Sequence, residues 1–353
     1  MKLLFATGRP FFPDLFGGAE RSMHGALTGL LGCGHQCEGL ATHGQFLGRS
    51  LLTLKRSLSQ SRIYSTCDLK AGFPMWRTRS WMLHQAFTER LRIYKPEIVF
   101  TQLSSAGKLA EWSLQAGIRP FIFIRDMADV PFDRTTTENK EIRFIANSVS
   151  TASWANEKFS INASVVYPSV DVSKFKVASN PEYITFINPV KEKGVDLAIL
   201  IAKCLPNLKF LFVESWPLDR EQMNYLSAQI RDTKNIVFWR RRMNVQSIYD
   251  VTKLLIVPSL WQEAFGRVII EAQACGIPVI GRDIGGIPEA IGRGGFTLSE
   301  HAGADEWSRT IESVIENKTM MNELSRSAIS NAKQGDWSPE KVLSILNSLI
   351  EEP

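Results

Sequence analysis

The stretch from residue 254 to residue 289 constrains the fold more than any other part of the sequence. Residues 254–257 are wholly apolar and end at a proline, which is typical of a short strand buried on both faces of a parallel sheet. Apolar side chains then recur at helical spacing between Gly266 and Gly276, which predicts a helix of about three turns. A second apolar run at residues 279–280 and a Gly-Gly loop follow. This order of strand, loop, helix, strand and loop predicts a parallel α/β unit.

Two glutamates stand within this unit, Glu263 in the loop and Glu271 inside the helix. Units of this kind bind ligands at the carboxyl ends of their strands, where helix N-termini offer unpaired N–H groups to phosphate. A carboxylate accepts hydrogen bonds from two hydroxyl groups well, and a ribose or a hexose presents such hydroxyls. Two glutamates alone are more often an ordinary loop acid and an exposed helix acid. The residues around them therefore decide whether they form a binding site.

A lysine follows an earlier predicted strand, residues 184–187. Lys193 precedes Gly194 and a predicted helix over residues 195–204. A lysine at the end of a strand, next to a glycine and a helix N-terminus, can neutralise a diphosphate leaving group. Glu214 likewise stands at the carboxyl end of a predicted strand over residues 208–214.

An ordered set of residues in the stretch 254–289 resembles the signature of retaining glycosyltransferases of family GT4, which have the GT-B fold. The residues that carry this resemblance are Glu263, Phe265, Gly266, Glu271, Ala272, Gly276, Pro278, Gly285, Gly286, Pro288 and Glu289. The resemblance implies two Rossmann-like domains with parallel sheets that face a central cleft. It also implies that the nucleotide binds mainly to the second domain and that the sugar lies between Glu263 and the first domain.

The resemblance assigns roles at the donor site. Glu271 would hold the ribose hydroxyls, and Lys193, helped by Arg267, would stabilise the charge on the departing diphosphate. Asn188 stands where most relatives have an arginine, and it brings no charge. Arg267 or one of Arg240, Arg241 and Arg242 is then expected to supply that charge. The candidate catalytic residues are Glu263, Lys193 and Arg267, and the candidate donor-binding residues are Glu271, Gly266, Phe265, Asn188, Gly17, Gly18, Glu214 and Val268.

The beginning of the chain also reads as strand, glycine loop and helix, over residues 2–31. Gly17 and Gly18 can bring backbone N–H groups close to an anion, and they resemble the family's N-terminal glycine loop, which faces the donor phosphate and the acceptor. Arg125 and Asp126 end a predicted strand at the same sheet edge, where many relatives have a histidine. Arg125 either meets an anionic group on the donor or acceptor, or pairs with Asp126.

The chain of 353 residues, 44% of them apolar, is long enough for two hydrophobic cores. We expect one domain over residues 1–167 and a second over residues 168–337, with a boundary near Pro168. By resemblance, the terminal segment 338–353 is a helix that packs back on the first domain.

Basic residues are concentrated in the segment 49–95, which has ten of them against two acidic residues and several aromatic ones. Such a segment can bind an anionic membrane face, nucleic acid or an anionic substrate, or it can be a solvated helix face with the aromatics in the core. Peripheral contact with an anionic membrane is retained as the hypothesis, and nucleic acid is not expected. The basic residues are Arg49, Lys55, Arg56, Arg62, Lys70, Arg77, Arg79, Arg90, Arg92 and Lys95.

No apolar run is long enough for a signal peptide or a membrane span, so we expect a cytoplasmic protein, with the inner membrane face as its site of peripheral contact. Five scattered cysteines argue against a disulfide framework. Cys33, His35 and Cys37 read better as a helix end and the next strand than as a metal site. With no Asp-x-Asp cluster visible, we expect metal-independent transfer and no cofactor.

The sequence therefore predicts transfer of a hexose from a UDP- or GDP-sugar to a hydroxyl of a glycan, a lipid-linked glycan or a small molecule, in polysaccharide biosynthesis. The family resemblance implies retention of anomeric configuration without a protein nucleophile. A nucleotide-sugar 2-epimerase of the same fold and a non-catalytic nucleotide-sugar-binding protein are the alternatives. A Rossmann dehydrogenase is disfavoured because no Gly-x-Gly-x-x-Gly follows the first strand.

Overall fold

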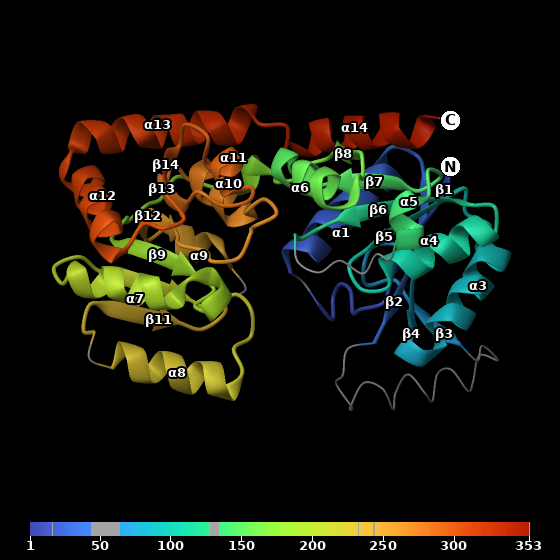
Figure 1. The fold of residues 1–353 in the computed structure, drawn as a ribbon, viewed down its shortest axis with the longest axis horizontal. Coiled ribbons are helices and arrows are strands. Elements are labelled where there is room, and N and C mark those ends of the chain that lie inside the picture. Colours follow the sequence, from blue (N-terminus) through green and yellow to red (C-terminus); the bar gives the residue numbers. More distant parts are fainter. Residues whose placement is uncertain (16, 44–63, 128–133, 232, 243, 353) are drawn as a thin grey trace. The chain divides into compact units, whose positions relative to one another are not determined.

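The computed structural model describes residues 1–15, 17–43, 64–127, 134–231, 233–242 and 244–352 (Figure 1). The chain divides into two compact units. Unit 1 comprises residues 1–169 and 339–353, and unit 2 comprises residues 170–338.

Unit 1 contains an eight-stranded sheet in the order β3-β4-β2-β1-β5-β6-β7-β8. All neighbouring strands run parallel except β3, which pairs antiparallel with β4 at the sheet edge. The predicted parallel sheet is therefore confirmed, with one antiparallel edge strand added. The strands are β1 (Lys2–Thr7), β2 (Gln36–Thr42), β3 (Ser65–Asp68), β4 (Met75–Thr78), β5 (Ile98–Gln102), β6 (Arg119–Ile124), β7 (Arg143–Ala146) and β8 (Ala163–Val165).

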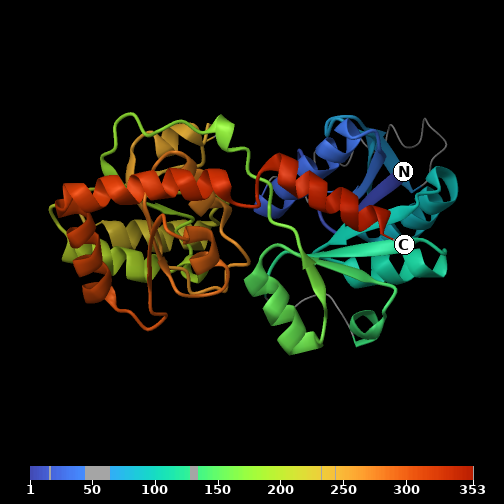
Figure 2. The same ribbon diagram turned by 90° about the horizontal axis from the view of Figure 1, so that it is seen from above.

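Helices cover both faces of this sheet. Leu3 and Phe5 of β1 pack in one core cluster with α1 and α14, whereas Leu4 and Ala6 pack in another with α3, because successive strand residues point to opposite faces. The carboxyl-terminal helix α14 packs against α1 (Figure 2). The helices are α1 (Gly18–Gly32), α3 (Leu83–Tyr94), α4 (Ala106–Gln115), α5 (Arg134–Glu138), α6 (Val149–Phe159) and α14 (Pro339–Glu351), with a short 3-10 helix, η1 (Ser80–Met82).

Unit 2 contains a six-stranded, fully parallel sheet in the order β11-β10-β9-β12-β13-β14. The stretch 254–289 folds as predicted, since β12 and β13 are adjacent parallel strands joined through α10. The strands are β9 (Tyr183–Ile187), β10 (Phe210–Val213), β11 (Ile236–Trp239), β12 (Thr252–Val257), β13 (Val279–Arg282) and β14 (Gly295–Leu298). The helices are α7 (Val195–Cys204), α8 (Arg220–Ile230), α9 (Gln246–Tyr249), α10 (Arg267–Ala274), α11 (Ile287–Ile291), α12 (Ala304–Glu316) and α13 (Lys318–Gln334), with 3-10 helices η2 (Val172–Lys174) and η3 (Lys191–Lys193).

The periodicity of residues 307–332 predicts one helix, but the structure contains two, α12 and α13. The helix is interrupted at Asn317, whose side chain accepts a hydrogen bond from the backbone N–H of Met320 (3.0 Å). Asparagine is a strong N-cap because its side chain satisfies a helix N–H that has no partner within the helix. The cap therefore starts a new helix where the apolar pattern alone continues.

Two of the basic residues in the segment 49–95 face the interior of unit 1. Arg77 is 4% exposed, and its guanidinium donates to the carbonyl of Phe11 (3.0 Å). Arg90 is 2% exposed and lies 3.8 Å from the ring centroid of Trp76. These two arginines are not available for the hypothesised membrane contact, because each is buried against aromatic or backbone groups.

The remaining basic residues of this segment divide into two sets. Lys70, Arg92 and Lys95 are exposed, and Arg79 is half-buried beside the exposed indole of Trp81. Arg49, Lys55, Arg56 and Arg62 lie outside the described residues. Among the helices that the structure does describe, none is both long and apolar enough to cross a bilayer.

Candidate functional site

The candidate residues of unit 2 gather at the carboxyl ends of its strands. Asn188 directly follows β9, Glu214 directly follows β10, and Glu263 lies in the loop after β12. Because these strands are parallel neighbours, their carboxyl ends meet at one edge of the sheet. Residues from distant parts of the sequence therefore form one polar cluster.

An ion pair between Lys193 and Glu263 lies at the centre of this edge. The ammonium of Lys193 donates to Oε1 of Glu263, and the two side chains are 12% and 19% exposed. Gly194 allows this approach, because it has a φ of +81° and a Cβ there would lie 2.1 Å from the carbonyl oxygen of Pro258. The Lys-Gly pair can thus sit directly against the loop that carries Glu263.

Backbone hydrogen bonds fix the loop that carries Glu263. The N–H groups of Leu260 and Trp261 both donate to the carbonyl of Glu192 (2.9 and 3.0 Å). The N–H of Gly286 donates to the carbonyl of Glu263 (2.7 Å), and a Cβ on Gly285 would lie 2.4 Å from the same oxygen. The Gly-Gly loop after β13 therefore supports the backbone of Glu263 from the other side.

Helix α10 begins at this edge with Gly266 as its N-cap, in the left-handed conformation (φ +95°). Arg267, in its first turn, donates to Oε1 of Glu271 (3.3 Å). The phenol of Tyr249 donates to Oε2 of the same carboxylate (2.8 Å). Burial and the Glu271 charge raise the Tyr249 pKa well above its ordinary value, so the hydroxyl remains a donor. Both oxygens of Glu271 are thus oriented from within the protein.

Two other candidates of this region differ in exposure. The side chain of Phe265 is buried, and its ring lies 5.7 Å from that of Trp337, so only the backbone of Phe265 is left to meet a ligand. Val268 is half-buried in the first turn of α10.

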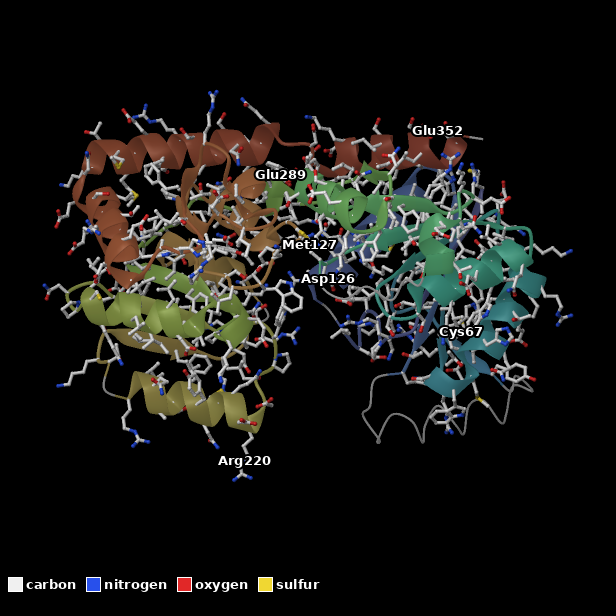
Figure 3. All side chains as sticks on the ribbon, in the orientation of Figure 1. Cys67, Asp126, Met127, Arg220, Glu289 and Glu352 are labelled. Carbon is white, nitrogen blue, oxygen red and sulfur yellow. The ribbon has the colours of Figure 1, made fainter. Side chains whose placement is uncertain are left out.

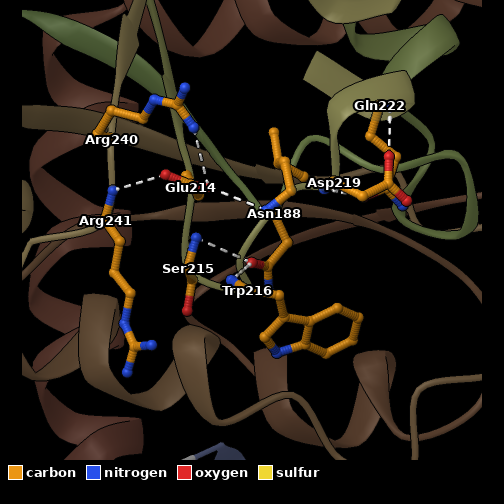
Figure 4. A network of polar contacts seen from close by, with 9 residues as sticks. Asn188, Glu214, Ser215, Trp216, Asp219, Gln222, Arg240 and Arg241 are labelled. Carbon is orange, nitrogen blue, oxygen red and sulfur yellow. Dashed lines mark hydrogen bonds and ion pairs between the residues drawn. The ribbon is translucent and has the colours of Figure 1, made fainter. Parts of the chain in front are cut away.

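Asn188 and Glu214 hold the loops after β10 and β11 (Figure 4). Asn188 has a φ of +64°, and its Oδ1 accepts hydrogen bonds from the N–H groups of Ser215 (3.1 Å) and Trp216 (2.8 Å). The Glu214 carboxylate accepts from the N–H groups of Leu218 (2.9 Å) and Arg241 (3.1 Å). Both side chains are more than nine-tenths buried. They position the backbone of these loops, one of which brings Trp216 to 5.0 Å from the Lys193 ammonium.

The sequence offered no signal for two residues of this cluster, Tyr249 and Trp216. Tyr249 belongs to a four-residue helix and is not part of any of the motifs described above. Trp216 follows Glu214 in a loop, and its ring lies 5.0 Å from the ammonium of Lys193. Only the fold brings these aromatic side chains to the charged residues.

The candidates of unit 1 lie at the carboxyl ends of β1 and β6 or in the loops that follow. The N–H of Gly17, the N-cap of α1, donates to the carboxylate of Glu20 (3.0 Å), so this N–H already has an anionic partner. Gly18 is the first residue of α1. Glu20 is buried and also lies 3.7 Å from the guanidinium of Arg9.

Arg125 follows β6 and is half-buried. Its guanidinium donates to the side chains of Gln102 (2.9 Å) and Ser22 (3.3 Å) and lies 4.5 Å from the ring centroid of Phe123. Asp126 follows it, next to Met127 (Figure 3). Two polar side chains and one aromatic ring thus contact the Arg125 guanidinium within unit 1.

In the described part of the chain, no group of three or more His, Cys, Asp or Glu side chains could hold a metal ion. Cys37 is buried in β2, and burial raises the pKa of its thiol to about 12. Cys33 lies on the other side of the turn, at the exposed end of α1.

Comparisons with known proteins identify relatives of this chain. Residues 171–335 match the model of the family described as glycosyl transferases group 1. The D-inositol 3-phosphate glycosyltransferase of Mycolicibacterium vanbaalenii is 28% identical over 204 residues, which cover 49% of this chain and 44% of the relative. The protein of the same name from Gordonia bronchialis is 39% identical over 92 residues, which cover 26% and 20%. The similarity thus spans less than half the length of these relatives.

Solved structures match almost the whole chain. A glycosyltransferase from Rickettsia africae has a TM-score of 0.78 and 16% identity, with 99% of this chain and 97% of that chain covered. Anabaena HepE in complex with UDP-glucose has a TM-score of 0.74 and 19% identity, with 99% of each chain covered. At these identities the likeness concerns the fold, and the GT-B fold expected from the sequence is confirmed.

The anchoring role of Asn188 predicts a loss of stability on its removal. Asn188→Gly should lower the free energy of unfolding by about 2 kcal/mol, because two backbone N–H groups lose their acceptor. Asn188→Ala should lower it by about 1 kcal/mol more, because alanine is strained at positive φ. Urea unfolding measures both, with Asn180→Ala as the exposed control. Equal stability of Asn188→Gly and the wild type would contradict this role.

The interactions of Glu214 predict a dependence of stability on pH. Burial raises the pKa of Glu214. The hydrogen bonds from Leu218 and Arg241 and the charge of Arg240 lower it by more, so the net pKa lies below the ordinary 4.5. A lowered folded pKa contributes stability above about pH 4.5 that is lost as the pH falls through the folded value. The difference in unfolding free energy between wild type and Glu214→Gln should therefore shrink in acid. An undiminished difference at low pH, with exposed Glu312→Gln as control, would show that the charge is not responsible.

Proposed function

Residues 171–335 belong to the family of glycosyl transferases group 1, and from this premise we propose that the protein is a glycosyltransferase. It moves a hexose from a nucleotide diphosphate sugar to a hydroxyl group of an acceptor. The observation that carries the proposal is the Lys193–Glu263 ion pair at the sheet edge, beside the N-terminus of α10 and the oriented Glu271 carboxylate. These groups match three of the four parts of such a donor, namely the diphosphate, the sugar and the ribose.

Glu271 is suited to the ribose. A carboxylate has about four lone-pair directions, and Tyr249 and Arg267 use one on each oxygen. Acceptor capacity therefore remains for two ribose hydroxyls. Tyr249 and Arg267 also hold the carboxylate in one orientation, so little freedom is lost when the ribose binds.

Lys193 and Arg267 are suited to the diphosphate. When the bond between the anomeric carbon and the phosphate oxygen breaks, negative charge develops on the departing diphosphate. Cations held beside that oxygen interact more strongly as the bond breaks, and this difference lowers the barrier. Lys193 would exchange the Glu263 carboxylate for the diphosphate, which frees Glu263 to meet the hydroxyls of the sugar. Because two cations and a helix N-terminus supply the charge, the proposed transfer is metal-independent.

The retaining stereochemistry and the acceptor are also proposals. We propose same-face attack by the acceptor hydroxyl without a protein nucleophile, as the GT4 resemblance implies. The acceptor is a glycan, a lipid-linked glycan or a small molecule, and polysaccharide biosynthesis is the proposed process. Gly17, Gly18, Arg125 and Asp126 of unit 1 are the proposed acceptor or phosphate contacts. Any peripheral contact with an anionic membrane would involve the exposed Lys70, Arg92 and Lys95 rather than the buried arginines.

A UDP-sugar is the first donor to test, because HepE, which shares the fold, was solved with UDP and with UDP-glucose. Thermal unfolding in the presence of UDP- and GDP-sugars would identify the donor, since a ligand that binds the folded state raises Tm. Incubation of that donor alone then separates transfer from the alternative, because a 2-epimerase yields an epimer without an acceptor. The proposal fails if no nucleotide sugar raises Tm.

Substitutions at the donor site test the assigned roles. Lys193→Ala should lower kcat/KM for transfer by about 100-fold or more, because it removes a cation that faces the developing charge. Glu271→Gln should mainly raise KM for the donor, because the amide cannot accept from two hydroxyls as a carboxylate does. Lys191→Ala and Glu312→Gln, both exposed, are the matched controls. Undiminished transfer by either site variant, at unchanged stability, would remove the role assigned to that residue.

A further inference from the structure

Trp216 lies in the loop between β10 and α8 and has no part in the function proposed above. Its side chain is 47% exposed, although large aromatic side chains are usually well buried. Either the loop is poorly held and leaves the indole exposed without a function, or the fold holds the indole at the surface for a ligand to contact. The contacts of the loop distinguish these two cases.

Buried side chains hold the backbone of the loop that carries Trp216. The Oδ1 atom of Asn188 accepts from the N–H groups of Ser215 and Trp216, and Oε1 of Glu214 accepts from the N–H of Leu218 (Figure 4). Asn188 and Glu214 are themselves 9% and 6% exposed. Three hydrogen bonds from loop N–H groups to buried side chains thus fix a short loop whose own aromatic side chain remains at the surface.

The exposed indole is also oriented. The ammonium of Lys193 lies 5.0 Å from its ring centroid, within range of a cation–π contact. In Figure 4 the indole extends away from the Arg240 guanidinium on the other side of Glu214. Its place is therefore beside the cation that meets the diphosphate in the proposed reaction.

A rigid, half-exposed tryptophan is a favourable contact surface. Its large flat ring loses little conformational freedom when a ligand binds, because the loop and the side chain are already ordered. Aromatic rings stack on the flat face of a nucleobase and on the apolar face of a sugar ring. A nucleotide sugar carries both kinds of ring, one on each side of its diphosphate.

We propose that Trp216 binds the donor by stacking on one of its rings, next to the diphosphate that Lys193 contacts. Trp216 is thus a donor-binding and specificity-determining residue, and Asn188 is the residue that positions it. This inference rests on the proposed function, since it takes a nucleotide diphosphate sugar as the ligand. The ring is the nucleobase or the transferred sugar, and UDP, which contains the base but not the transferred sugar, separates the two.

The test is isothermal titration calorimetry of wild type, Trp216→Ala and Trp216→Phe with inorganic pyrophosphate, UDP and UDP-glucose. Stacking on the base predicts that Trp216→Ala binds UDP and UDP-glucose about tenfold more weakly, which corresponds to about 1.4 kcal/mol. Stacking on the sugar predicts that loss for UDP-glucose alone. In both cases pyrophosphate binding is unchanged, and Trp216→Phe retains most of the affinity because a flat aromatic face remains.

Two results would overturn the inference. If Trp216→Ala weakens all three ligands equally, the indole acts only by placing the Lys193 ammonium. If it weakens none, the indole does not contact the donor. The variant should fold normally because the loop backbone is held by Asn188 and Glu214, and urea unfolding verifies this.

The control variant is Trp81→Ala, which removes a 71% exposed tryptophan of unit 1 and should leave all three affinities unchanged. Failure of the proposed function gives a different result. In that case the wild type itself would bind neither UDP-glucose nor the corresponding GDP-sugar, and the stacking role would fall with it.

Discussion

The ion pair between Lys193 and Glu263 joins the two segments from which the candidate site of unit 2 is built. It exists because Gly194 brings the chain against Pro258, and because the Glu192 carbonyl and the Gly285-Gly286 loop hold the Glu263 backbone from two sides. Taking two charges out of water is unfavourable, and replacing a buried pair by apolar groups is often neutral or stabilising. The pair remains partly exposed at the carboxyl edge of a parallel sheet, so the diphosphate proposed above can compete with Glu263 for its cation.

The rest of the site is organised by buried side chains that accept hydrogen bonds. Asn188 and Glu214 fix the loops after β10 and β11, and Tyr249 and Arg267 fix the Glu271 carboxylate. Polar groups arranged before a ligand arrives need not reorganise during the reaction, and this is the main source of electrostatic stabilisation of a transition state. The exposed side chains, Trp216 among them, are therefore carried by loops that are themselves immobilised.

Much of the fold follows from apolar patterning. The runs at residues 2–7, 184–187 and 254–257 are short, apolar and followed by turns, and each is a central strand in the structure. The sequence predicts the position of Lys193 beside a glycine and a helix N-terminus, because Lys193, Gly194 and the first residue of α7 are adjacent in the sequence. The proposed pairing of roles between Glu263 and Glu271 came from the family resemblance rather than from spacing.

Other features depend on contacts between distant residues. Tyr249 is 22 positions from Glu271, and the tertiary fold brings its hydroxyl to the carboxylate. The sequence predicts a surface cation at Arg77, but the residue is buried because β4 lies inside the sheet, between β3 and β2. There the carbonyl of Phe11 accepts a hydrogen bond from its guanidinium. The N-cap at Asn317 is a local signal, and it starts a new helix although the apolar period of the sequence continues across it.

We propose above that the sheet edge around Lys193 binds the diphosphate of a nucleotide sugar. A crystal structure of the protein with UDP, or with GDP if that nucleotide raises Tm more, tests it most directly. We predict phosphate oxygens within hydrogen-bond distance of the Lys193 ammonium, a Lys193–Glu263 pair that has separated, and ribose hydroxyls on the Glu271 carboxylate. A nucleotide bound elsewhere, with the Lys193–Glu263 pair intact, would contradict the claim.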